Sequence, residues 1–332
     1  MYIVITRNTN ILAATKTPNA MLVTTHTNTE LTAQANIANL IAIFIEQLDV
    51  TPVSRSVYSR SLKQFFTWVE AKSYQLTALT RTHILQYKEE LLAEGKSGLT
   101  VAAYINAVRQ FYTWAEAEKL YPNIAAQVKA PKRKKEFRKH GLHPAQVKEL
   151  LGYAGQHFTT RDRAIIEVLL RTGLRTIEIS RANVGDLTYL EGKRILKVHG
   201  KGRSEKDNFV VLTEKTYQPL AEYLASRRIT SANEPLFIST SNNSAGNRLT
   251  TRTISQIAKD SLAAIGINLP SFTAHSFRHT AALAILRAGG TLEDVQFTLR
   301  HTNPATTQIY TAALEQERRL ANSGEALIDN LY

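Results

Sequence analysis

The sequence predicts a mainly α-helical protein with two domains: a four-helix bundle, then a larger α+β domain with a small antiparallel sheet. Three observations predict this fold. Apolar residues recur at spacings of three and four from about residue 31 onward. A basic, proline-containing stretch then interrupts the helical pattern. Beyond it, helical patterns resume around two strand-like runs, RILKV and FVVL.

Composition points to an anionic partner. The chain has 332 residues, enough for two domains, and carries 41 Lys+Arg against 28 Asp+Glu, a net charge of +13. That excess suggests an anionic polymer or surface as partner, and charge alone does not decide between a nucleic-acid-binding protein and a merely basic soluble protein. The absence of cysteine excludes disulfides, thiol catalysis and cysteine zinc sites, and fits a reducing cytoplasm. We expect no signal peptide, no membrane span and no membrane partner.

The first domain is expected over 31–128. Residues 1–30 are rich in Thr and Asn without a sustained period, so we interpret them as a flexible arm. Amphipathic spacing then predicts four helices, ending at the Thr51-Pro52 break, after Val69, at Gly95 and before Pro122.

A basic linker is expected over 129–141. Seven of the eleven residues in KAPKRKKEFRK are basic, and Pro131 argues against a packed element. Such a run is often merely solvated, but between two domains of a basic protein we expect it to follow a DNA phosphate backbone. The candidate DNA contacts are Lys129, Lys132, Arg133, Lys134, Lys135, Arg138 and Lys139.

The second domain is expected over 142–320. A helix begins after His143-Pro144, an apolar helix ends at Gly173, and a short helix follows to Arg181. The two strand-like runs, 194–198 and 209–212, flank HGKGRSEKDN, which is typical of a hairpin loop. Further helices are expected at about 215–228, 251–265, 275–288, 291–299 and 304–320. We expect the tail, 321–332, to form a detachable helix that docks on a partner.

Several polar residues suit cleavage of a DNA strand without a metal or ATP. Two arginines can clamp the non-bridging phosphate oxygens, since guanidinium donates bidentately and stays charged. A lysine on a hairpin can protonate the leaving oxygen, and a histidine can accept the proton of the attacking hydroxyl. A tyrosine nucleophile conserves the bond energy in a phosphotyrosine. Each candidate alone has an ordinary structural explanation; their joint order and spacing favour the catalytic one.

The motifs T-G-L-R-T-I-E-I, H-G-K-G, H-S-F-R-H and L-R-H-T-N-P-A-T-T-Q-I-Y resemble those of the tyrosine recombinase (phage integrase) family, which includes the Xer recombinases. They cover about 143–315, while the bundle and linker resemble the family's core-binding (SAM-like) domain by architecture. The resemblance implies two phosphate-clamping arginines, a general acid, a histidine that supports proton transfer with a second site residue that is His or Trp in the family, a nucleophile and a bracing carboxylate. In that order they are Arg175 and Arg278, Lys201, His275 and His301, Tyr310 and Glu178.

The resemblance also implies an assembly. It implies a clamp around double-stranded DNA at specific recombination sites, a tetramer, and strand exchange through a Holliday junction, with the C-terminal tail on a neighbouring protomer. No cofactor or metal is implied, accessory proteins are possible partners, and a nucleoid-associated cytoplasmic location is expected. Phage, transposon, plasmid and chromosome-dimer substrates all stay open.

Two alternatives remain. A type IB topoisomerase-like enzyme would use the same chemistry without a specific site, and a DNA-binding regulator would keep the fold without turnover. One residue departs from the family's pattern: Arg300 precedes His301 where glycine is usual. We expect it to alter the turn or to add a phosphate contact.

Overall fold

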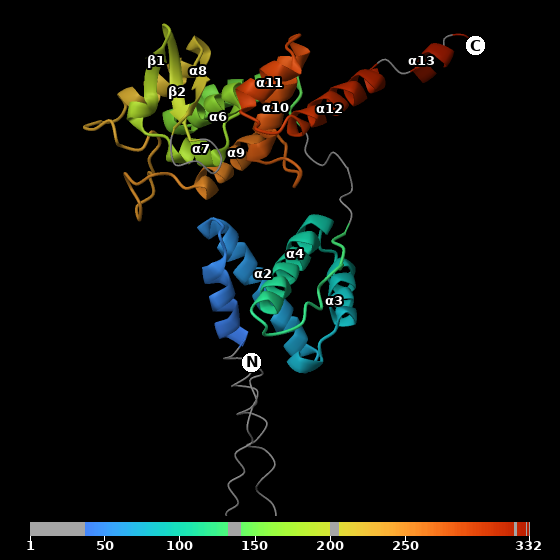
Figure 1. Cartoon of the computed structure of the whole chain (residues 1–332). Helices are drawn as coiled ribbons and strands as arrows, with labels where there is room; N and C mark the ends of the chain where they lie inside the picture. The colour runs from blue at the N-terminus through green and yellow to red at the C-terminus, as the bar shows by residue number, and fades with distance from the viewer. Residues whose placement is uncertain (1–36, 132–140, 200–205, 322–323, 330, 332) are drawn as a thin grey trace, which may run out of the picture. The chain divides into compact units, whose positions relative to one another are not determined.

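The computed structural model describes residues 37–131, 141–199, 206–321, 324–329 and 331 (Figure 1). The chain divides into two compact units, one on each side of the 132–140 gap. The arm over 1–30 and nearly all of the basic linker lie outside the described residues, so the expectations for them stay predictions. Among the described residues, no helix is both long and apolar enough to cross a membrane.

The first unit is a helical bundle, as the sequence predicts. Thr51 accepts a hydrogen bond from the backbone of Ser54 and Pro52 opens the next helix, which explains why the chain breaks and restarts there. Ser97 caps another helix in the same way. The described elements are a helix over 37–47, α2 (Pro52–Ala71), a 3-10 turn (Leu76–Ala78), α3 (Arg81–Ala93) and α4 (Gly98–Ala117).

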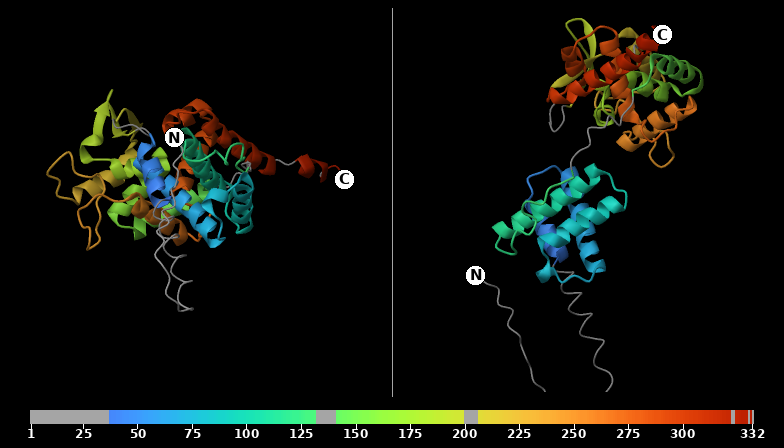
Figure 2. Two further views of the ribbon diagram at one scale, coloured as in Figure 1. Left: turned by 60° about the horizontal axis from the view of Figure 1, so that its bottom comes forward. Right: turned by 90° about the vertical axis from the view of Figure 1, so that its right-hand side faces the viewer.

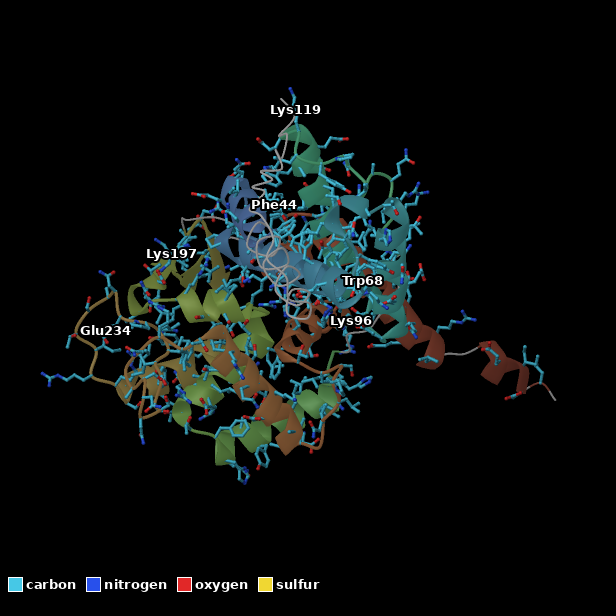
Figure 3. The ribbon with its side chains drawn as sticks, turned by 90° about the horizontal axis from the view of Figure 1, so that it is seen from below. Phe44, Trp68, Lys96, Lys119, Lys197 and Glu234 are labelled. Carbon is cyan, nitrogen blue, oxygen red and sulfur yellow. The ribbon has the colours of Figure 1, made fainter. Side chains whose placement is uncertain are left out.

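Aromatic side chains fill the core of this unit. Phe44 is 2% exposed and meets Phe111 edge-to-face, with ring centroids 5.6 Å apart. Phe65 contacts Tyr87 in the same geometry at 5.1 Å. Figure 3 shows Phe44 among the helices, whereas Lys119 projects at the end of α4. The core of this unit is thus built largely from apolar residues that recur at helical spacing.

The second unit combines helices with a three-stranded antiparallel sheet, which confirms the predicted fold class. Strand order is β1-β2-β3, and Leu196 of β2 pairs with Val210 of β3, both buried in the core. The elements are α5 (Pro144–His157), α6 (Thr160–Thr172), α7 (Thr176–Arg181), a 3-10 turn (Val184–Asp186), β1 (Leu187–Leu190), β2 (Lys193–Val198), β3 (Asn208–Val211), α8 (Glu214–Ala225), α9 (Thr251–Ala264), α10 (Ala274–Arg287), α11 (Leu292–Leu299), α12 (Ala305–Ala321) and α13 (Gly324–Asp329).

Helix α10 is the centre of this unit. It packs against α6, α9, α11 and α12. The sheet lies at the other side of the unit from α12 (Figures 1 and 2). Every residue over 276–283 is buried, including Arg278 and His279. Because a helix buried nearly all round should be apolar, these polar side chains need internal partners.

Gly173 brings α6 close to α11. It ends α6 with φ +60°, a left-handed conformation that favours glycine. A Cβ atom at this position would lie 2.4 Å from Leu299 Cδ2 at the end of α11. The end of α6, the middle of α10 and the end of α11 therefore converge, and the polar residues described below lie at this convergence.

Candidate active site

Arg175 and Glu178 form a compact pair at the start of α7. The Arg175 backbone N–H donates to Glu178 Oε2 at 2.7 Å, and its Nη1 donates to Oε1 at 2.9 Å. The Glu178 side chain is 5% exposed and that of Arg175 is 24% exposed. The pair is therefore unlike a solvated surface pair, because its carboxylate is enclosed and only the arginine reaches the surface.

Arg278 joins two helix ends. From α10 its Nη1 donates to the Gly173 carbonyl and its Nη2 to the Leu299 carbonyl. These oxygens lie at the C-terminal ends of α6 and α11, where a cation is favoured. Burial lowers the pKa of Arg278 to about 9, and Arg175 adds to the lowering. The side chain stays charged at neutral pH.

Arg300 also reaches Glu178. It follows α11 in a left-handed conformation, φ 54° and ψ 49°, which costs a residue with a side chain about 1–2 kcal/mol. Its Nη2 donates to Glu178 Oε2 at 2.9 Å across 122 residues of sequence, and its Nη1 to the Thr298 carbonyl at 2.6 Å. At the position where the resembled family usually has glycine, Arg300 thus adds a third guanidinium to the cluster.

Tyr310 lies on α12 between two histidines. It is 2% exposed and packs with Leu283, Leu299 and other buried apolar side chains. The ring of His301 stacks on it at 6.2 Å with 3° between planes, and His279 meets its edge at 5.2 Å. Burial raises the pKa of Tyr310, while Arg278 and Arg175 oppose that rise. The two cations therefore favour the phenolate form.

His301 is neutral in this environment. It is 8% exposed, and its Nδ1 lies 3.0 Å from the Thr307 hydroxyl. Burial, followed by the charges of Arg278 and Arg175, lowers its pKa to about 4. A neutral imidazole beside a tyrosine can accept a proton, which is the role of a general base.

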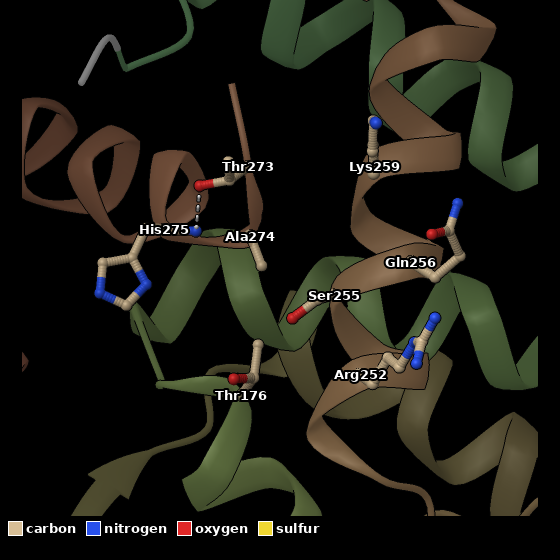
Figure 4. Close-up of a pocket in the computed structure, with 8 residues that line it drawn as sticks. All are labelled: Thr176, Arg252, Ser255, Gln256, Lys259, Thr273, Ala274 and His275. Atoms are coloured by element: carbon tan, nitrogen blue, oxygen red, sulfur yellow. Dashed lines mark hydrogen bonds between the residues drawn. The ribbon is translucent and has the colours of Figure 1, made fainter. Parts of the chain in front are cut away.

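His275 lies three residues before Arg278 on the same helix. It is exposed near the start of α10 and lines a pocket of about 360 Å³. Figure 4 shows it on one side of that pocket, with Arg252, Gln256 and Lys259 of α9 on the other. Thr176, which follows Arg175 in the sequence, also lines this pocket. The pocket therefore lies beside residues that adjoin the cluster in sequence. Its catalytic role stays a prediction.

Two groups of predicted residues are outside the reach of the structure. Lys201 belongs to 200–205, and all linker candidates except Lys129 belong to 132–140, so they lie outside the described residues. Lys129 is exposed near the end of the first unit. The sequence did not assign a role to His279 or Thr307, and it did not predict the contact between Arg300 and Glu178. His279 had a signal, since it adjoins Arg278, whereas nothing in the spacing marks the other two.

The geometry defines a class of site: arginines and histidines gathered around a buried tyrosine in a helical domain with a small sheet. The model of the Phage integrase family matches residues 141–317, and that of its N-terminal SAM-like domain matches residues 42–119. The chain belongs to the phage integrase family.

Named relatives agree with this membership. The tyrosine recombinase XerC of Leptospira interrogans is 34% identical over 59% of this chain, and the aligned region spans 61% of that relative's own length. XerC of Thermodesulfovibrio yellowstonii is 30% identical over 76% of this chain and 83% of its own.

A solved structure shares the fold. The crystal structure of the XerH site-specific recombinase bound to palindromic difH substrate is 20% identical, with a TM-score of 0.68. The match covers 82% of this chain and 80% of that one.

Proposed function

We propose that this protein is a site-specific recombinase that cleaves and rejoins DNA strands through a 3′-phosphotyrosine at Tyr310. The observation that carries the proposal is the convergence of Arg175, Arg278 and His301 on one tyrosine. Family membership supports it, because relatives are named tyrosine recombinases. The net charge of +13 also suits a DNA partner.

In the proposed cleavage step the Tyr310 oxygen attacks the scissile phosphorus. The P–O5′ bond breaks as the Tyr–O–P bond forms, and the phenolic proton passes to a histidine. We assign this role to His301, because its ring is neutral and lies parallel to that of Tyr310. Arg175 and Arg278 would stabilise the charge on the non-bridging oxygens. Lys201 is proposed to give the leaving oxygen its proton.

Rejoining reverses these events. A 5′ hydroxyl attacks the phosphotyrosine, so no external energy source is needed. Exchange with a second duplex would yield a Holliday junction and would require more than one protomer. This requirement suits a tetramer in which the C-terminal tail, 321–332, docks on a neighbouring protomer. We assign DNA contacts to the 31–128 bundle, the basic linker and the 142–320 domain, and a nucleoid-associated cytoplasmic location follows from a DNA substrate.

Access to Tyr310 must change during the reaction. Only 2% of the residue is exposed, so little of its surface is open to a phosphate in the packing described here. We propose that DNA binding shifts α12 relative to α10 and α11 and thereby exposes Tyr310.

The test separates binding from chemistry. A randomised duplex pool is first enriched for DNA that the Tyr310→Phe protein retains, which yields a site. The wild-type protein is expected to form a covalent complex with a nicked version of this duplex, and Tyr310→Phe to bind it without one. A covalent complex with Tyr310→Phe would show that another residue is the nucleophile. Relaxation of any supercoiled plasmid would favour the topoisomerase alternative, and binding without cleavage the regulator.

A further inference from the structure

Arg300 occupies a turn that suits glycine. Its N–H donates to the Phe297 carbonyl at 3.0 Å, and the next N–H, of His301, donates to the Gln296 carbonyl at 3.1 Å. These two bonds define the motif that ends helices with a left-handed residue. Glycine adopts this conformation most easily, so the presence of arginine calls for a compensating interaction.

The compensating interaction is internal. The Arg300 side chain is 7% exposed and Glu178, its ion-pair partner, is 5% exposed. The other contact, with the Thr298 carbonyl, holds the guanidinium at the C-terminal end of α11. An arginine at a helix end would ordinarily extend into solvent, whereas this one turns back into the cluster.

Glu178 thereby serves two guanidiniums. Its Oε1 accepts from Arg175, and its Oε2 accepts from both the Arg175 backbone and Arg300. Without Arg300, the whole negative charge of this enclosed carboxylate would face Arg175 and neutralise it. With Arg300, the three groups together retain one positive charge.

Exposure separates the roles of the two arginines. The Arg175 side chain is 24% exposed and can meet a ligand from outside, whereas the Arg300 side chain, which binds the same carboxylate, is only 7% exposed. A phosphate can therefore reach Arg175 more readily than Arg300.

We propose that Arg300 is a positioning residue for strand cleavage: it takes up the charge of Glu178, so that Arg175 keeps its own charge and outer donors for the scissile phosphate. This inference rests on the proposed function. The charge of Arg300 also acts on the rest of the cluster, since it contributes to the lowered pKa of Arg278 and of His301.

The experiment measures single-turnover cleavage of the nicked duplex selected with Tyr310→Phe, together with its binding affinity. Arg300→Gln keeps the left-handed turn strained but removes the charge, and Arg300→Gly relieves the turn and removes the charge. Both are expected to slow cleavage on the order of ten- to a hundredfold, with DNA affinity within about twofold of wild type. Arg300→Lys should recover part of the rate.

Two further variants isolate the shared carboxylate. Adding Glu178→Gln to Arg300→Gln should speed cleavage relative to Arg300→Gln alone, because no unbalanced carboxylate then holds Arg175. Arg163→Gln is the matched control, since Arg163 forms an ion pair with Glu222 on the surface; it should cleave at the wild-type rate.

A readout independent of cleavage is the His301 titration, followed by NMR. His301 faces Arg278, Arg175, Arg300 and Glu178, and its ring stacks on Tyr310. Arg300→Gln should raise the pKa of His301, because one nearby cation is lost, and Arg300→Lys should raise it less.

Several outcomes would overturn the inference. Wild-type cleavage by Arg300→Gly would mean that arginine is merely tolerated in the turn. A loss confined to DNA affinity would make Arg300 a phosphate ligand. An unchanged pKa of His301 in Arg300→Gln would mean that the charge of Arg300 does not act on the cluster. Failure of the wild-type protein itself to form a covalent complex would instead reject the proposed function, and the inference with it.

Discussion

Replacing Glu178 by glutamine tests how the cluster is held together. The carboxylate is 5% exposed and binds two guanidiniums, while buried Arg278 adds its positive charge nearby. Removing the negative partner of a buried ion pair costs roughly 3–5 kcal/mol. Since the amide retains one acceptor oxygen, we expect a loss near the lower end, about 3 kcal/mol, in the stability of the second unit.

Hydrogen exchange measured by mass spectrometry provides the assay. Peptides from α10 report the opening free energy of the second unit. Both tryptophans, Trp68 and Trp114, lie in the first unit, so their fluorescence during urea unfolding serves as an internal control that should not change.

The matched control variant is Glu222→Gln. Glu222 pairs with Arg163, and their side chains are 48% and 33% exposed. Exposed pairs contribute about 0–1 kcal/mol, so this variant should lower the opening free energy of α10 by less than about 1 kcal/mol. If Glu178→Gln does no more than Glu222→Gln, the carboxylate does not hold the arginines together and the reasoning fails.

Three more predictions follow from the same geometry. The pKa of His301, about 4 in the folded protein, lies below its value of about 6.5 in the unfolded chain, so the unfolded chain binds the proton first as the pH is lowered. The free energy of unfolding should therefore fall as the pH is lowered from about 6.5 to about 4. His301→Gln should flatten this dependence, which unfolding measured at a series of pH values would show. Gly173→Ala should destabilise the second unit by roughly 1–3 kcal/mol, because its Cβ would clash with Leu299; an unchanged opening free energy of the α10 peptides in hydrogen exchange would contradict the close approach. Replacing the basic residues at 132–135 with glutamine should reduce the slope of log affinity against log salt concentration by about 0.9 per lost phosphate contact. A slope equal to that of the wild-type protein would mean that these residues make no phosphate contacts.

The helices were predictable because their apolar stripes are long and periodic. The start of α9 at Thr251 and the end of α11 at Leu299 agree with the expected bounds. Strand β1, Leu187–Leu190, was missed: four residues carry little periodic signal, and Tyr189 and Leu190 are exposed. That strand is defined by its pairing with β2, which is a property of the folded unit.

The site was predictable as a set of residue types, but not as a set of contacts. The order of Arg175, Arg278, His301 and Tyr310 along the chain indicates phosphate chemistry, and the structure brings these four residues together. The contact between Glu178 and Arg300 spans 122 residues, so no local spacing could reveal it. What the sequence did mark was an arginine in a turn that favours glycine, and the left-handed φ explains why that position matters.

The central claim is that Tyr310 attacks DNA. The most direct measurement is mass spectrometry of protease digests after the wild-type protein has reacted with the selected, nicked duplex. A nucleotide-linked peptide that contains Tyr310, joined through a 3′ phosphate, is the expected result. A link at any other residue, or a cleaved strand with no covalent peptide, would contradict the account.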